Sequence, residues 1–317
     1  MLGCQDDDTL DWPEYKSGEH IVSAICTMTN RERFRRTLGF EQVDRLPALE
    51  WATWWVKTVD RWHDDGLPRN LQSPQEISGY FGLDAHSQHW ISSASSSCPQ
   101  PSGHGQPLIS SWEEYEAIKP HLYPEKAFDE DAIAGIARRQ QEGEIVVWMT
   151  LEGFFWWPRV LFGIEQHLFA IYDQPYLMKQ INEDHLSYSL RALDAFCRIC
   201  VPDFMTFAED MSYNHGPMLS KSQFDEFIVP YYARIVPSLL DWGIVPFVDS
   251  DGDVEEIIGW VMEQGIQGIL PLERMAGVDV ALLREKYPDL RMIGAFDKTV
   301  MHLGEDRIRE EFERLLP

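Results

Sequence analysis

Seven short apolar segments along the chain alternate with stretches of helical periodicity. Six of them run directly into a carboxylate, and they cover residues 46–50, 146–152, 204–210, 245–249, 268–273 and 292–297. The seventh, residues 86–90, has the weakest pattern. Alternating strands and helices favour a parallel sheet. Because parallel strands of a barrel open their carboxyl ends on one face, the pattern predicts six acids at one mouth: Glu50, Glu152, Asp210, Asp249, Glu273 and Asp297.

Helix signals fill the intervals between these segments. Thr29 and Glu32 form a capping box, and Phe34 and Leu38 give the following helix an amphipathic pattern. Further helices are predicted over residues 74–83, 112–119, 130–142, 174–200, 220–228, 229–241, 253–264, 279–286 and 304–315, with an aromatic cluster at 154–157 starting another. Residues 92–111 are rich in Ser, Gly and Pro, and loops of that length serve as lids or are disordered.

The predicted fold is a (β/α)8 TIM barrel over residues 28–317, preceded by a loosely ordered, acidic extension over residues 1–27. A chain of 317 residues accommodates such a barrel, which needs roughly 250 residues. Only seven strands are predicted, and an open barrel would leave two unpaired edges. The N-terminal extension or a partner could close the gap. We expect instead that the last strand and helix are missing from this chain.

Composition narrows the class of partner. The formal net charge of −25 argues against nucleic acid and anionic membranes, which require a basic surface. No apolar run approaches the 18 or more residues of a membrane span. The five cysteines are few and odd in number, which suits a cytoplasmic protein without a disulfide framework. Cys197 and Cys200 are predicted to be ordinary buried thiols.

Asp249 and Asp251 are the strongest candidates for chemistry. They lie two residues apart at a predicted strand end, so both side chains point to one face, and Gly252 allows a sharp turn. A shared cation or a shared proton is then feasible. The alternative is an Asx-turn that caps the helix near Asp253. Glu273, at the end of the neighbouring segment, is a candidate third metal ligand or general base.

The remaining candidates each have a structural alternative. Asp210 and His215 could move protons, although a solvent-exposed loop histidine is the more common case. Asp297 could act catalytically or form an ion pair with Lys298. The tryptophans Trp51, Trp54, Trp55, Trp156 and Trp157 could stack on a flat substrate or pack at the barrel rim, and the sequence does not separate these readings.

Several motifs occur together from Met28 onward. They are MTNRERF at 28–34, DRLP at 44–47, ED at 209–210, GPMLS at 216–220, FIVPYY at 227–232, DSDGD at 249–253 and GAFDK at 294–298. In this order they resemble the uroporphyrinogen decarboxylase superfamily, which includes corrinoid-dependent methyltransferases. The resemblance implies a (β/α)8 barrel with a deep pocket at the strand carboxyl ends.

The resemblance to the decarboxylase branch is incomplete. Where those enzymes carry arginines that bind substrate carboxylates, residues 49–55 have none, and Glu50 and Trp54 occupy the segment. A tyrosine of that branch falls near Arg159. Glu50, Trp54, Arg159 and Tyr213 are therefore the expected substrate-binding residues. A substrate with eight carboxylates would also meet like-charge repulsion in an acidic mouth.

The methyltransferase branch holds zinc with a His-x-Cys motif, and this position reads Asp249-Ser250-Asp251 here. The resemblance therefore implies a divalent metal (zinc, or magnesium or manganese, which oxygen ligands suit as well) held by Asp249, Asp251 and Glu273. Metal-assisted methyl transfer, with a corrinoid protein as partner, is the leading expectation. Cofactor-free decarboxylation of a porphyrinogen and a non-catalytic binding protein are the alternatives. A homodimer is compatible with each.

Overall fold

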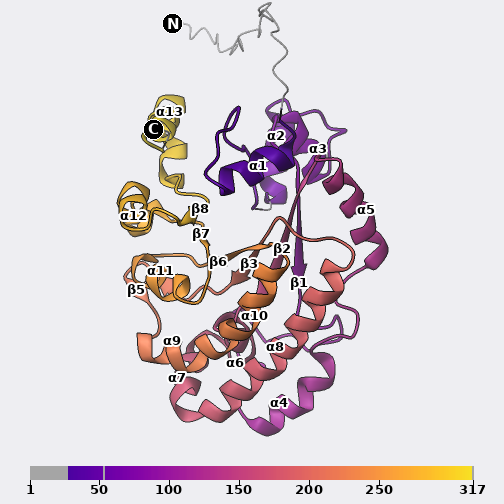
Figure 1. Ribbon diagram of the computed structural model, residues 1–317, viewed down its shortest axis with the longest axis vertical. Helices are drawn as coiled ribbons and strands as arrows, with labels where there is room; N and C mark the ends of the chain where they lie inside the picture. The colour runs from indigo at the N-terminus through magenta and orange to yellow at the C-terminus, as the bar shows by residue number, and fades with distance from the viewer. Residues whose placement is uncertain (1–27, 53, 316–317) are drawn as a thin grey trace, which may run out of the picture.

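The computed structural model describes residues 28–52 and 54–315, so the predicted extension over residues 1–27 lies outside them. Its centre is a six-stranded parallel sheet in the order β1-β2-β3-β6-β7-β8 (Figure 1). The strands are β1 (His86–Ile91), β2 (Val146–Glu152), β3 (Phe204–Ala208), β6 (Val245–Asp249), β7 (Gly268–Leu270) and β8 (Arg291–Met292). β4 (Ser212–Tyr213) and β5 (Gly216–Pro217) form a separate antiparallel hairpin. The chain is an α/β protein.

Helices connect the strands, mostly where the periodicity predicts them. They are α1 (Asn30–Leu38), α2 (Val56–Asp64), α3 (Pro74–Tyr80), α4 (Trp112–Ile118), α5 (Glu130–Gln141), α6 (Trp156–Phe162), α7 (Ile164–Asp173), α8 (Pro175–Cys197), α9 (Lys221–Phe227), α10 (Val229–Asp241), α11 (Glu255–Met262), α12 (Val280–Lys286) and α13 (Glu305–Leu315). Short 3-10 helices are η1 (Lys119–His121), η2 (Arg274–Ala276) and η3 (Lys298–Leu303). The sequence pattern missed α2, α7 and the β4–β5 hairpin.

The two faces of the sheet have different coverings. Alternate residues of β2 and β3 separate into two sets, because successive side chains of a strand point to opposite faces. Trp148 and Phe204 pack against Phe34 and Leu38 of α1 on one face. The other face packs under α5, α8, α10 and α11 in the largest apolar cluster. In Figure 1, α1, α2 and α3 are grouped near the amino end of β1, opposite its arrowhead.

The sheet is open within the described residues, with β1 and β8 as its edges. The predicted first strand, residues 46–50, is wrong because this segment forms no strand. Ala48 accepts one main-chain hydrogen bond from Asp84 (2.6 Å), but its own N–H donates to the Asp84 carboxylate (2.9 Å). Pro47 has no N–H to donate. A ladder with β1 therefore does not form.

The DRLP motif contributes to a partly buried charge network at the amino end of β1. Arg45 donates to both Asp84 oxygens (2.7 and 2.5 Å), and Arg33 donates to Asp44 (2.7 and 2.9 Å). Arg33 also lies 3.4 Å from Asp84. Burial alone would raise the pKa of Asp84, but Arg45, the Ala48 N–H and Arg33 outweigh it and lower that pKa. The network fixes residues 44–48 against the start of β1.

The long loop predicted over residues 92–111 is present and contains neither helix nor strand. It is packed at several points, since Ser93, Cys98 and Ile109 are buried. Tyr123 donates its N–H to the Ser93 carbonyl at 2.7 Å, and Ser95 donates to His121 at 2.9 Å. A lid role for this loop stays a prediction.

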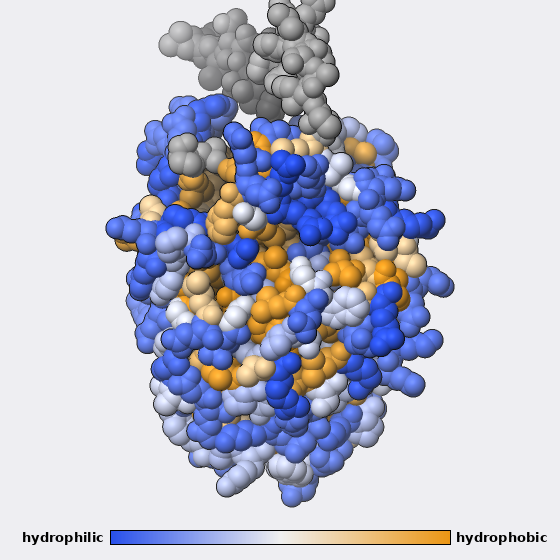
Figure 2. Space-filling view, viewed as in Figure 1, coloured by the Kyte–Doolittle hydropathy of each residue, from blue (hydrophilic) through white to orange (hydrophobic). Residues whose placement is uncertain are grey.

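On the side viewed in Figure 1, hydrophobic residues gather across the middle of the surface (Figure 2).

Candidate functional site

Three of the predicted carboxylates meet at the carboxyl ends of β3 and β6. Asp249 is the last residue of β6 and shares a face with Phe247, so its side chain lies on the α1 side of the sheet. Asp251 follows on the same face, and its N–H lies 3.4 Å from Asp210 Oδ1. We call Asp210, Asp249 and Asp251 the carboxylate cluster.

Burial has the largest effect on the pKa values of Asp249 and Asp251, and repulsion between the carboxylates adds to it. Burial, Asp210 and Asp251 raise the pKa of Asp249 to about 7. Burial also raises the pKa of Asp251, with Asp210 and Glu273 acting in the same direction and Lys298 opposing them. Within the described residues, no hydrogen-bond donor contacts the Asp249 carboxyl group. This carboxyl group therefore exchanges its proton near neutral pH.

Glu273 lies beside the carboxylate cluster but both of its oxygens are engaged. Oε1 lies 2.6 Å from Lys298 Nζ, and Oε2 accepts the Gly252 N–H at 3.0 Å. Burial alone would raise the pKa of Glu273, but Lys298 and Gly252 N–H reverse the effect and lower it. Glu273 therefore anchors the turn after Asp251. The sequence offered Lys298 only as a partner for Asp297.

Arg159, from α6, supports Asp210. Its Nη1 donates to the Asp210 carbonyl at 3.0 Å and lies 3.7 Å from Asp210 Oδ2. The guanidinium also lies over the Trp156 ring, 5.0 Å from its centroid. Asp210 has a φ of +46°, a left-handed conformation that a non-glycine residue rarely adopts. Arg159 therefore lies beside the carboxylate cluster, and its predicted substrate-binding role stays a prediction.

The β4–β5 hairpin places two further candidates near the cluster. The Asp253 N–H donates to the Tyr213 carbonyl at 2.9 Å, and a Cβ at Gly252 would lie only 2.6 Å from the Tyr213 backbone. Gly252 has a φ of +83°, which suits glycine at this close approach. Tyr213 and His215 are both exposed, with ring centroids 5.7 Å apart. The turn after β6 is thus joined to the hairpin.

The structure does not bring all the predicted site residues together. Glu50 accepts the Ala52 N–H (2.9 Å) and faces His86, the first residue of β1, at the opposite end of that strand from the predicted mouth. Trp54 packs edge-on against Trp62 of α2. Asp297 caps η3 by accepting the Thr299 N–H at 2.9 Å. The expectation of one six-acid mouth is therefore wrong.

Two other strand-end acids are buried in the protein. Glu209 accepts N–H groups at the start of α6 and the Tyr232 hydroxyl. Glu152 accepts the Ser93 N–H at 2.8 Å, and burial raises the pKa of its carboxyl group to about 7. Ser93 Oγ lies 3.0 Å from His185 Nδ1, a buried pair for which the sequence gave no signal. These contacts give both acids structural partners.

The expected metal ligands fit a metal poorly. Both oxygens of Glu273 have partners, and the third carboxylate beside Asp249 and Asp251, that of Asp210, has the Arg159 guanidinium 3.7 Å away. In the part of the chain that the structure describes, no three His, Cys, Asp or Glu side chains are placed to hold a metal ion. The donor set matches a shared proton better than the divalent cation that the motif implies.

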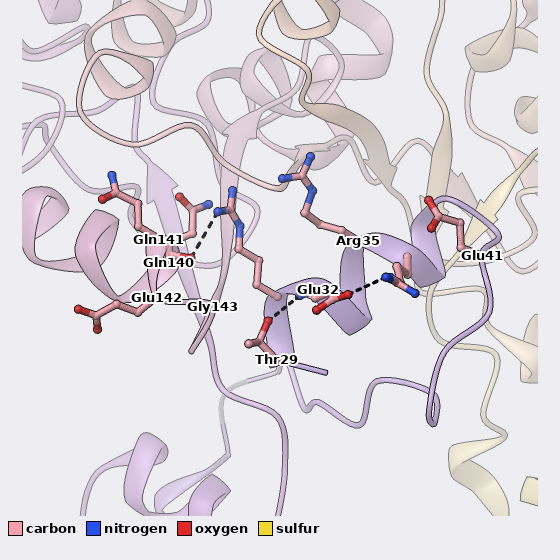
Figure 3. A pocket seen from close by; sticks show the side chains of 10 residues that line it. Thr29, Glu32, Arg35, Glu41, Gln140, Gln141, Glu142 and Gly143 are labelled. Atoms are coloured by element: carbon pink, nitrogen blue, oxygen red, sulfur yellow. Dashed lines mark hydrogen bonds and ion pairs between the residues drawn. The ribbon is translucent and has the colours of Figure 1, made fainter. Parts of the chain in front are cut away.

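A hollow of about 510 Å³ lies away from the carboxylate cluster, between α1 and the end of α5 (Figure 3). Arg31 donates to the Gln140 carbonyl and to Asp203, and Arg36 pairs with Glu32. Basic side chains at the carboxyl end of a helix are favourable for stability. The polar side chains that line the hollow hold α1 against α5. The carboxylate cluster is therefore the stronger candidate for a reactive site.

Comparison with known proteins leaves the family open. No family model matches the chain, and no curated protein is detectably similar to it in sequence.

No helix among the described residues is both long and apolar enough to cross a membrane. Cys197 and Cys200 are free and buried, as expected for ordinary thiols, and burial raises their pKa values to about 12 and about 11.

Proposed function

We propose that the chain is an enzyme of the uroporphyrinogen decarboxylase superfamily, with its sheet as the greater part of a (β/α)8 barrel. The strand order supports this, because strands that follow one another in the chain lie side by side in the sheet, the β4–β5 hairpin apart. The motifs at 209–210 and 249–253 supply the carboxylate cluster. Among the described residues Cys98, Cys197 and Cys200 are buried and free, which suits the cytoplasmic location that we also propose.

The reaction that the geometry supports best is cofactor-free decarboxylation with Asp249 as the general acid. One observation carries this proposal: the Asp249 carboxyl group has no donor among the described residues and a pKa raised to about 7. A general acid works best when its pKa lies near the operating pH. In such a site Asp249 gives its proton to an electron-rich ring carbon of the substrate.

The rest of the cluster would stabilise the positive charge that this proton creates. Asp210 and Asp251 flank Asp249, and carboxylates preorganised beside a developing cation lower its energy. When the bond between a side-chain carbon and its carboxylate then breaks, carbon dioxide leaves and the electron pair forms an exocyclic double bond that neutralises the ring cation. The side-chain carbon takes a proton from water, and the ring carbon returns its proton to Asp249, which restores the aromatic ring and the acid. A porphyrinogen carrying few carboxylates, rather than eight, suits the acidic surroundings.

Porphyrin binding and carbon dioxide release test this function together. Binding is expected to change porphyrin absorbance and to quench tryptophan fluorescence, and labelled carbon dioxide is expected from a carboxylated porphyrinogen. Asp249→Asn, which cannot donate a carboxyl proton, should retain porphyrin binding and lose release by at least about 100-fold. Absence of both binding and release in the wild-type protein would exclude this function.

Metal-assisted methyl transfer with a corrinoid protein is the second candidate. It rests on the resemblance of the 249–251 segment to a metal-binding motif, and the engagement of Glu273 by Lys298 weakens it. Metal analysis after loading with zinc, magnesium or manganese separates the two candidates. One metal ion per chain, lost in Asp249→Ala, would favour methyl transfer over cofactor-free decarboxylation.

A further inference from the structure

Ser250 joins the two loops that carry the carboxylate cluster. It lies between Asp249 and Asp251 and is 1% exposed. Its N–H donates to the Leu270 carbonyl at 3.0 Å, which continues the pairing of β6 with β7 by one residue. Its Oγ accepts the N–H of Met211, in the loop after β3, at 3.1 Å. One side chain thus links the ends of two neighbouring strands.

The Ser250–Met211 contact follows directly on the left-handed turn at Asp210. The Glu209 and Asp210 N–H groups both donate to the Asp249 carbonyl, at 2.9 and 3.1 Å. The next N–H, that of Met211, donates to Ser250. Sparsely populated backbone conformations persist where surrounding contacts determine them, and they gather at functional sites. Removal of the Ser250 hydroxyl would release the third of these consecutive contacts.

We propose that Ser250 is a positioning residue: its hydroxyl holds the Asp210 turn against the end of β6 and so keeps the Asp210 carboxylate beside Asp249. The inference deepens the proposed function and rests on it, since Asp210 is one of the two groups that tune the acid. Ser250 itself faces away from the cluster, because it alternates with Asp249 and Asp251 along the strand.

The positioning role of Ser250 is tested by titrating Asp249 while the chemical shift of its carboxyl carbon is monitored by NMR. In Ser250→Ala the Asp210 turn loses one of its three consecutive main-chain contacts with the end of β6, so the Asp210 carboxylate should lie farther from Asp249 and Asp249 should titrate at a lower pH than in the wild type. The other charges around the cluster are unchanged in this variant: Asp251 faces Asp249, Glu273 and Lys298 face Asp251, and Arg159 contacts Asp210.

Ser189→Ala is the matched control, because Ser189 is equally buried at 1% exposure and its hydroxyl has no partner among the described residues. This variant should titrate like the wild type. Ser250→Thr keeps a hydroxyl and should restore the wild-type midpoint. If Ser250→Ala does not fold, Ser250→Cys gives the same reading, because a thiol is a weaker acceptor.

An unchanged midpoint in folded Ser250→Ala or Ser250→Cys would overturn the positioning role while leaving the proposed function intact. A wild-type Asp249 that titrates in the ordinary range of aspartate would instead overturn the proposed function, and this inference with it. A midpoint that falls in Ser250→Ala, returns in Ser250→Thr and does not change in Ser189→Ala supports the inference. Turnover should follow the same order, with its pH optimum displaced in Ser250→Ala.

Discussion

The Glu209 carboxyl group occupies the space that a side chain on Gly153 would need. A Cβ built at Gly153 would overlap that carboxyl group. Its oxygens accept the N–H groups of Phe154 at 3.0 Å and Phe155 at 2.7 Å, at the start of α6. Favourable placement of an acid at a helix amino end explains why Glu209 is engaged apart from the carboxylate cluster, although Asp210 follows it directly in the chain.

Gly153→Ala should therefore destabilise the fold by roughly 2 kcal/mol or more, because overpacking displaces a buried carboxylate from its hydrogen bonds. Urea unfolding measures the change. Gly135→Ala is the control, since Gly135 lies within α5 and nothing lies within 4 Å of its built Cβ. Alanine there should stabilise by about 0.5–1 kcal/mol. Equal effects at the two sites would contradict the packing argument.

Asp84→Ala should destabilise the fold by about 1–3 kcal/mol, because it removes the buried carboxylate that pairs with Arg45 and accepts the Ala48 N–H, while Arg33 keeps its pair with Asp44. The pKa of Asp84 is lowered in the folded state, so its contribution is present above the unfolded pKa and is lost as pH falls. The difference between variant and wild type should shrink in acid. Asp65→Ala, which removes an exposed ion pair with Arg61, should change little.

The strands and most helices could be predicted because their signals are local. β2 begins with four apolar residues and is buried at every position, and the Thr29 side chain accepts the Glu32 N–H, one of the two hydrogen bonds of the predicted capping box. Residues 46–50 carry a similar apolar signal, yet the Asp84 carboxylate takes the Ala48 N–H that a ladder would need. That competition comes from a residue 36 positions away, so no local pattern reports it.

The candidate site was predictable only where it depended on strand alternation. Asp249 and Asp251 share a face because a strand has a period of two residues. Which other acids join them depends on tertiary contacts: Glu209 is taken by α6, and Glu50 faces the start of β1. Ser250 gave no signal either, because its role is to accept one main-chain N–H from a distant loop.

Lys298→Met should weaken the anchor between Glu273 and the turn after β6. Lys298 is 61% exposed and Glu273 12% exposed, so solvent screens the pair and the loss should not exceed about 1 kcal/mol at neutral pH. The pKa of Glu273 is lowered in the folded state, so this loss should vanish as pH falls below the range in which Glu273 ionises. Lys286→Met, at an exposed pair with Glu255, serves as the control.

Asp249→Asn should remove the proton donor of the cluster and, at alkaline pH, make the folded protein more stable. The folded state holds the Asp249 proton up to about pH 7, whereas the unfolded chain releases it near the ordinary aspartate pKa of 3.8. Between these limits the folded protein binds more protons, so wild-type stability falls as pH rises. Asn carries no charge, so the variant should be more stable at pH 8, by at most about 4 kcal/mol at 1.4 kcal/mol per unit. At pH 3 the two proteins should unfold at nearly the same urea concentration. A stability difference between variant and wild type that does not change with pH would show that Asp249 does not hold its proton in the folded state.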